Sequence, residues 1–176
     1  MHPRALLAAT ALLLLACSEL LAFTVEEESS ATVEGLGTLG AVLGALELAD
    51  FTVSLDEQLT NQGVNRGDLA EARVAALVLS SSDGTLDFMD TMRVAIESPG
   101  VATARIAHVE DIPEGATEVT LLLDDVDLVP YLQAESLAIT TDVTGTAPIE
   151  DTTVVARIAV DIVATPQGAC NAARED

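Results

Sequence analysis

Residues 154–162 read VVARIAVDI and form the clearest β-strand pattern in this chain. One parity of the stretch is wholly apolar: Val154, Ala156, Ile158, Val160 and Ile162. The other parity carries Arg157 and Asp161. Because successive side chains of a strand point to opposite faces, this alternation predicts a strand with one face in a core and one face toward water.

The same pattern recurs on the N-terminal side of this stretch. Candidate strands lie at 31–34, 51–55, 73–80, 92–96, 105–109, 119–123 and 137–143. Turn residues separate them at 98–100, 113–115 and 145–148, and Asp83-Gly84 is a hairpin signal. Short strands of period two with turns between them predict an all-β fold, an antiparallel Ig-like β-sandwich of about seven to eight strands.

Three segments depart from simple alternation. Residues 74–79 are apolar on both parities, which predicts a central strand covered on both faces. Asp56 is expected to cap a short helix that runs through Leu59 and ends at Gly63, and Pro130 fits one helical turn within 124–132. The glycine-spaced stretch 35–48 is expected to be a loop or a frayed helix over the core.

The N-terminus has the pattern of an export signal. Arg4 precedes an apolar run from Ala5 to Ala16, about 12 residues against the roughly 20 that a membrane-spanning helix needs. The run ends in Leu14-Leu15-Ala16-Cys17, which resembles the lipobox of bacterial lipoproteins. That resemblance implies cleavage after Ala16 and acylation of Cys17, and several acyl chains together hold a protein firmly in a bilayer. The alternative is a plain secretory signal cut nearby, for example after Ser18.

A wider resemblance covers the chain from about residue 31 to 164. The segments LDEQLTNQGV at 55–64, LDFMDTMRVAIESPG at 86–100, RIAHVEDIPEGA at 105–116 and DDVDLVPYLQAESLAIT at 124–140 are similar to a set of uncharacterised bacterial lipoproteins. That family has no assigned activity, so the resemblance implies only lipidation at Cys17. The expected organisation is a signal peptide at 1–16, a lipidated N-terminus and acidic tether at 17–30, a β-sandwich at 31–165 and a polar tail at 166–176.

The charge of the chain restricts its partners. It has 29 Asp and Glu against 7 Lys and Arg, a formal net charge of −22. Nucleic acids and anionic lipid headgroups attract cationic surfaces, so nucleic-acid binding is excluded. The expected location is the cell envelope. Ser18, where aspartate would resemble an inner-membrane retention signal, favours the outer membrane over the inner one.

Candidate catalytic groups are few. His108 is the one histidine outside the signal, and its parity with Ala104 and Ile106 predicts a partly buried or edge side chain. Cys170, in the polar tail, is expected to be an inert exposed thiol. Gly35, Gly37 and Gly40 match the letters of a dinucleotide fingerprint, but no βαβ unit follows them. These features predict no catalytic residues and no cofactor, although a site assembled only in three dimensions, such as that of a hydrolase, stays open.

Two groups of aspartates are weak candidates for a calcium site: Asp83, Asp87 and Asp90, and Asp124, Asp125 and Asp127. Calcium takes several oxygen ligands from flexible loops, but neither group has the spacing of the twelve-residue calcium loop. The sequence therefore predicts an envelope lipoprotein that is a structural or interaction module with an unidentified protein partner. A protein that binds calcium or a small ligand is the alternative.

Overall fold

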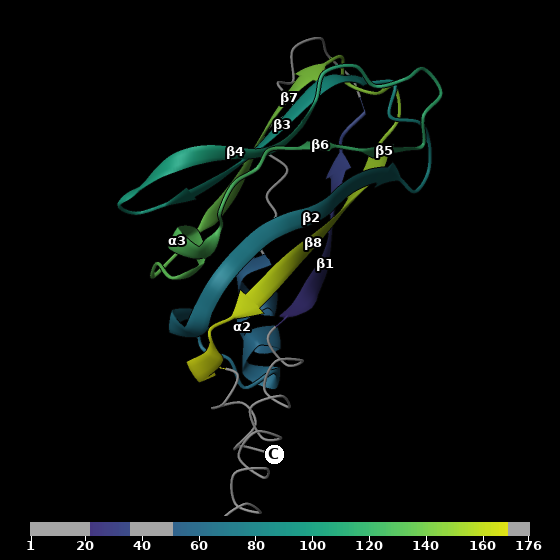
Figure 1. The fold of residues 1–176 in the computed structure, drawn as a ribbon. Helices are drawn as coiled ribbons and strands as arrows, with labels where there is room; N and C mark the ends of the chain where they lie inside the picture. The colour runs from purple at the N-terminus through teal and green to yellow at the C-terminus, as the bar shows by residue number, and fades with distance from the viewer. Residues whose placement is uncertain (1–21, 36–50, 169–176) are drawn as a thin grey trace, which may run out of the picture.

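The strand predicted at 154–162 lies inside a four-stranded sheet (Figure 1). In this computed structural model, which describes residues 22–35 and 51–168, β8 (Thr152–Ala164) pairs with β1 (Ala22–Val33) on one side and β2 (Leu69–Ser81) on the other. β5 (Glu118–Thr120) extends the sheet beyond β2. All these pairs are antiparallel, and we call this sheet, in the order β1-β8-β2-β5, sheet A.

The second sheet, sheet B, has the order β6-β4-β3-β7 and is also antiparallel. Its strands are β3 (Met89–Ser98), β4 (Val101–Val109), β6 (Leu122–Leu123) and β7 (Ala138–Gly145). β3 and β4 form a hairpin whose turn contains Gly100 at φ +81°. Such a φ is strained for any residue with a Cβ, so glycine at this position allows the tight turn.

The hydrophobic core lies between the two sheets. From sheet A, the apolar parity of β8 is buried throughout, with Val160 and Ile162 fully inaccessible. From sheet B, Met92, Val94 and Ile96 are buried on alternate positions of β3. Two sheets that each bury one apolar face against the other make a sandwich, so the prediction of an all-β antiparallel sandwich is confirmed.

The sandwich begins earlier than predicted. Residues 22–30, expected to belong to the acidic tether, lie in β1, which pairs with β8 along its whole length from Ala22 opposite Val163 to Val33 opposite Thr152. Only Val25 of this strand is fully buried. The run Glu26-Glu27-Glu28 interrupts the alternation of apolar and polar residues, so the sequence does not show this strand. The strand still forms, because an edge strand needs little apolar surface when its neighbour supplies the hydrogen bonds.

The strand predicted at 51–55 is wrong, because these residues begin helix α2 (Phe51–Asn61). Leu55 and Leu59 are both buried, and residues four apart share a face of a helix. Asp56 therefore lies inside the helix instead of capping it. The predicted stop at Gly63 is confirmed: Gly63 has φ +65° and Val64 N donates to Leu59 O at 2.9 Å, which is a Schellman motif.

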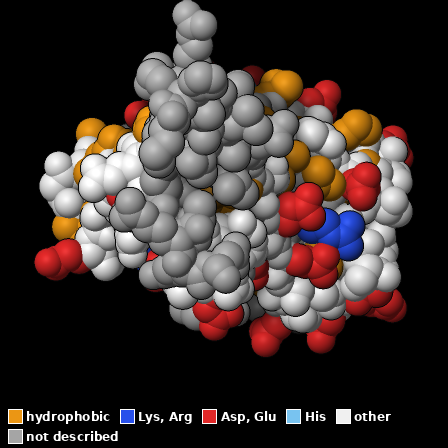
Figure 2. All heavy atoms as spheres, turned by 60° about the horizontal axis from the view of Figure 1, so that its bottom comes forward, with side chains coloured by type: hydrophobic (Ala, Val, Ile, Leu, Met, Phe, Trp, Pro, Cys, Tyr) orange, Lys and Arg blue, Asp and Glu red, His pale blue; other side chains and the backbone are white. Residues whose placement is uncertain are grey.

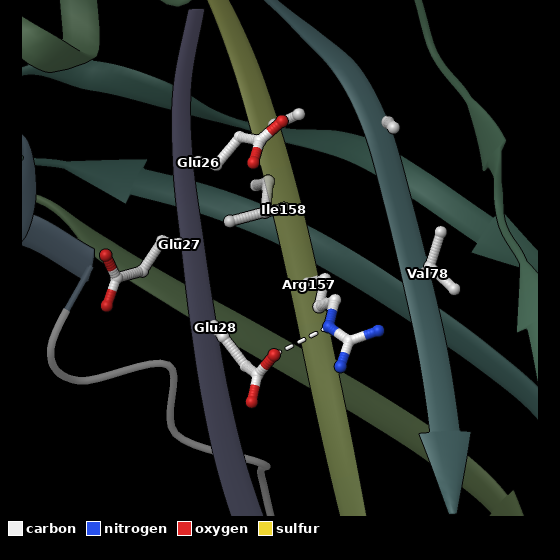
Figure 3. Close-up of a pocket in the computed structure, with 8 residues that line it drawn as sticks. Glu26, Glu27, Glu28, Val78, Arg157 and Ile158 are labelled. Carbon is white, nitrogen blue, oxygen red and sulfur yellow. Dashed lines mark hydrogen bonds and ion pairs between the residues drawn. The ribbon is translucent and has the colours of Figure 1, made fainter.

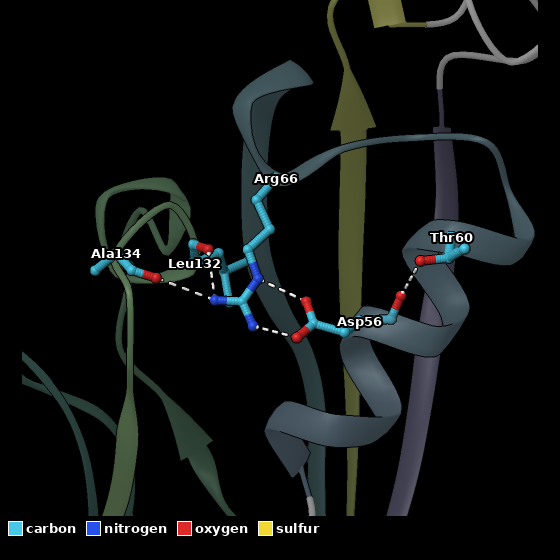
Figure 4. Close-up of polar contacts among 5 residues, drawn as sticks. All are labelled: Asp56, Thr60, Arg66, Leu132 and Ala134. Carbon is cyan, nitrogen blue, oxygen red and sulfur yellow. Dashed lines mark hydrogen bonds and ion pairs between the residues drawn. The ribbon is translucent and has the colours of Figure 1, made fainter.

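α2 lies at the end of the sandwich where β1 begins and β8 ends (Figure 1). Its Gln58 donates from Nε2 to Glu26 O at 3.1 Å, so the helix covers part of the free edge of β1. Arg66, in the 3₁₀ turn η1 (Arg66–Asp68), joins α2 to the segment after α3 (Val129–Leu132). Figure 4 shows its guanidinium between the Asp56 carboxylate, both N···O distances being 2.6 Å, and Ala134 O at 3.0 Å.

Two predicted connections differ from the structure. The strand predicted at 119–123 is divided, because β5 pairs with β2 of sheet A while β6 pairs with β4 of sheet B. Leu121, between them, is buried and donates from N to Leu77 O. The prediction of a hairpin at Asp83-Gly84 is wrong, because β2 and β3 lie in different sheets and residues 82–88 cross from one sheet to the other. The single helical turn at Pro130 is confirmed as α3.

Candidate functional site

The outer face of sheet A carries a shallow pocket of about 340 Å³ over β1, β8 and β2, which we call the sheet A pocket (Figure 3). Two rows of neighbouring residues run across it. Glu26, Ala159 and Ala76 make one row, and Glu28, Arg157 and Val78 make the next. The pocket thus has a floor of small apolar side chains from the two inner strands and an acidic rim on the edge strand.

The double apolar parity of β2 explains this floor. Leu77 and Leu79 are buried in the core, while Ala76 and Val78 point to the other face and are only half-buried. The prediction that β2 lies inside its sheet is confirmed. Its expected cover on both faces is wrong within the described residues, because the floor of the pocket stays partly exposed on the outer side.

The cation of the sheet A pocket is already neutralised by an ion pair. Arg157 Nε lies 2.6 Å from Glu28 Oε2, and this hydrogen bond raises the pKa of Arg157 above its ordinary value. Figure 3 shows the Glu26 and Glu28 side chains on the β8 side of β1, whereas Glu27 points away from the pocket. The Glu26 carboxylate has no hydrogen bond or ion pair within the described ranges, so it is free to meet a cation.

His108 lies on the outer face of sheet B, opposite Arg93 of β3 and Leu122 of β6. The prediction that it shares a face with Ile106 is wrong, because a register shift in the β3–β4 pairing reverses the parity between Arg105 and Ala107. Its side chain is 17% exposed, as expected for a partly buried histidine.

The neighbour of His108 is a carboxylate that serves another partner. His108 Nδ1 lies 3.4 Å from Asp124 Oδ2 but makes no hydrogen bond with it. Asp124 instead accepts two hydrogen bonds from Arg105, at 2.7 and 2.9 Å, which hold the pKa of Asp124 below its ordinary value. No serine hydroxyl in the part of the chain that the structure describes is bonded to His108, so these residues do not assemble a nucleophile, base and carboxylate.

The first group of calcium candidates holds loops in place. Asp83 accepts a hydrogen bond from Thr153 N at 2.9 Å. Asp87 accepts one from Gly115 N at 2.5 Å and one from Thr85 Oγ1 at 2.8 Å. Asp90 is exposed on β3. Asp83 and Asp87 therefore bind protein donors at separate points of the loop end of the sandwich.

The second group is divided in the same way. Asp124 binds Arg105, Asp125 forms an ion pair with Arg73, and Asp127 accepts a hydrogen bond from Val129 N at the start of α3. Among residues 22–35 and 51–168, no three His, Cys, Asp or Glu side chains are grouped as a metal ion requires. The structure therefore does not bring either trio together.

Several predicted features fall outside the described residues: the signal at 1–16, Cys17, Gly37, Gly40, and Cys170 in the tail. Gly35 is described and has a packing role. Its N donates to Asp151 Oδ1 at 2.8 Å, and a Cβ there would lie 2.5 Å from the Glu150 carbonyl carbon. Among residues 22–35 and 51–168, none of the helices has the length and apolar character that a membrane span requires.

A second recess, which the sequence did not indicate, lies at the loop end of the sandwich. It has a volume of about 510 Å³ between the loops 83–88 and 146–152. Ile149 beside it is 92% exposed. Its lining is mixed in character, with Asp83, Asp87 and Asp151 already bound to protein donors.

The surface around these features is strongly acidic. Figure 2 shows acidic side chains spread around the rim of one face, with basic side chains confined to one spot. Four arginines of the described chain form ion pairs with carboxylates: Arg66, Arg73, Arg105 and Arg157. Most of the positive charge in this part is therefore neutralised locally.

Comparison with known proteins gives no family. No family model matches the chain, and no curated protein matches it. Solved structures with some similarity include turnip yellow mosaic virus, at 15% identity and a TM-score of 0.31, covering 82% of this chain and 94% of that one. The decameric BFDV capsid protein has 10% identity and a TM-score of 0.36, with 80% and 97% covered. These values are too low to carry an inference about function.

Proposed function

We propose that this protein is an envelope lipoprotein, anchored through acyl chains on Cys17, whose β-sandwich binds another envelope protein. The sheet A pocket is the observation that supports the binding role. The solvent-facing side of an antiparallel sheet usually carries polar side chains. Here the half-buried side chains of Ala76, Val78 and Ala159 form a continuous apolar floor on that side. A contiguous apolar area with polar residues around it offers a surface on which side chains of a protein partner can pack.

A binding module fits the described residues better than an enzyme or a calcium protein does. The Asp124 carboxylate next to His108 is held by Arg105, and the aspartates 83, 87, 125 and 127 bind protein donors. A hydrolase of the serine type needs a nucleophile, a base and a carboxylate that orients the base in one cleft. A calcium site needs several free oxygens converging on one point.

The anchor is tested by the intact mass of the protein extracted from bacterial membranes. We expect a chain that begins at Cys17 and carries acyl groups, and a Cys17→Ser variant that is recovered without them. A mature chain that starts after residue 17, or one that keeps Met1, would contradict the lipoprotein proposal.

The binding role is tested by photo-cross-linking in the same membranes. A photoreactive amino acid replaces Thr120, which is exposed and lies opposite Val78 beside the pocket. The matched control replaces Thr103, which is exposed on β4 of sheet B. We expect a discrete cross-linked species from position 120 that is absent from position 103 and is lost when Val78 is changed to Thr. Identical products from both positions would refute a partner on sheet A.

A further inference from the structure

The sheet A pocket combines an apolar floor with a rim of one sign of charge. Its floor is formed by Ala76, Val78 and Ala159, and Glu26 and Glu28 flank it on β1. Since Arg157 is paired with Glu28, the net charge of the rim is negative. A ligand that fits must bring small apolar groups to the floor and positive charge to the rim.

We infer that the partner presents a basic, apolar segment of polypeptide to the sheet A pocket, an inference that rests on the proposed binding function. Complementary charge directs both the rate of encounter and the choice of partner. The whole chain carries a formal charge of −22. Long-range electrostatics therefore attract a basic partner and repel an acidic one. The same charge disfavours a second copy of this chain as the occupant, because two acidic rims would face each other.

The recess suits a flat, extended or small-residue segment. Its volume of about 340 Å³ accommodates a few side chains of a protein partner. The floor residues come from neighbouring inner strands: Ala76 lies opposite Ala159, and Val78 is two positions after Ala76 on β2. Short floor side chains allow a partner backbone to approach the sheet, while the Glu26 carboxylate stands within reach of a lysine or arginine at the edge.

The experiment must separate specific docking from the general attraction of cations to an acidic protein. The full-length protein in neutral detergent micelles is titrated into three labelled octapeptides, and fluorescence anisotropy reports binding. One probe alternates lysine and valine, the second alternates lysine and serine, and the third alternates glutamate and valine. We expect the lysine–valine probe to bind most tightly and the glutamate–valine probe not to bind.

Matched variants locate the site. We expect Glu26→Gln to lower the affinity for the lysine–valine probe about threefold at low salt, since one exposed charge contact contributes little more. The control Glu114→Gln removes an equal charge from the exposed turn at 113–115 and should leave affinity unchanged. Val78→Thr removes apolar surface at constant charge and should weaken binding. Its control, Val101→Thr, changes a half-buried valine of β4 and should not.

Equal affinity for the lysine–valine and lysine–serine probes, or equal losses from E26Q and E114Q, would overturn the inference, because both results mean diffuse electrostatic attraction. Tighter binding of the glutamate–valine probe would also overturn it. Such a failure leaves the proposed function intact when the cross-link at position 120 is present, since the partner would then be of another chemistry. Loss of that cross-link is the separate sign that the proposed function itself fails.

Discussion

Arg66 and Asp56 form a two-pronged ion pair, with Nε and one terminal nitrogen each 2.6 Å from a carboxylate oxygen. The same guanidinium donates to Ala134 O at 3.0 Å. One side chain therefore holds α2 beside the segment that follows α3, although Arg66 lies ten positions from Asp56 and 68 positions from Ala134 in the sequence.

Arg66→Ala should lower the free energy of unfolding by about 1–2 kcal/mol, because it leaves Asp56 and a half-buried carbonyl without a donor. Arg66→Lys should recover only part of this loss, since an ammonium group cannot bind both carboxylate oxygens in the fork geometry. Urea denaturation followed by circular dichroism measures both. Arg93→Ala is the control, because Arg93 is exposed and forms no ion pair among the described residues. Equal losses from both alanine variants would refute this role.

Asp124 should make stability depend on pH. Its pKa in the folded protein is lowered by the hydrogen bonds from Arg105, so its contribution is present above the unfolded-state pKa of about 4 and is lost as pH falls through the folded value. Asp124→Asn should therefore destabilise the protein at pH 7, and its difference from the parent should shrink below about pH 4. Urea unfolding between pH 7 and pH 3 measures this, with the exposed Asp90→Asn as control. A gap that stays constant over this range would contradict the expectation.

Gly145 and Gly67 should respond to alanine in opposite directions. Gly145 ends β7 at φ +154°, where a Cβ would collide with the Phe88 carbonyl and lie 2.9 Å from Met89 Cα. Gly145→Ala should cost about 1–3 kcal/mol through strain. A Cβ on Gly67 would meet nothing within 4 Å, so Gly67→Ala should be neutral or stabilise by up to about 1 kcal/mol. Thermal unfolding of the two variants tests this, and similar effects would refute it.

Two valines of β8 test which face of sheet A is covered. Val160 is fully buried in the core, and Val155 is half-buried on the outer face. Val160→Ala should cost about 2 kcal/mol, because it removes buried methyl groups and leaves a cavity. Val155→Ala should cost less than half as much, since its methyl groups still touch water. Equal costs in denaturant unfolding would mean that the outer face is covered as completely as the core.

The fold was predictable where local pattern and burial agree. The alternation of 154–162 and of Met92, Val94 and Ile96 each identifies a strand with one buried face, and both are confirmed. Phe51, Val53 and Leu55 show the limit, because five residues of period two also fit the first turns of a helix. Leu59 decides for the helix, being buried on the same face as Leu55.

The features missed from the sequence depend on pairing over long distances. β1 is stabilised by β8, more than 100 residues away, so its own acidic sequence gives little sign of it. The position of His108 depends on a register shift against β3. The sheet A pocket was predictable only in part. The sequence shows that residues 74–79 are apolar on both faces of the strand, but it does not show that the outer face has no covering layer within the described residues.

Under the proposed acylation of Cys17, the early start of β1 also limits the distance between the domain and the bilayer. With Cys17 acylated, residues 18–21 lie between the anchor and Ala22, the first residue of β1 that the structure describes as paired. A fully extended chain gains at most about 3.6 Å per residue, so the linker from Cys17 to Ala22 spans no more than roughly 18 Å. The domain would then lie close to the lipid surface. A partner embedded in or lying on the same leaflet would be within its reach, whereas a partner across the periplasm would not.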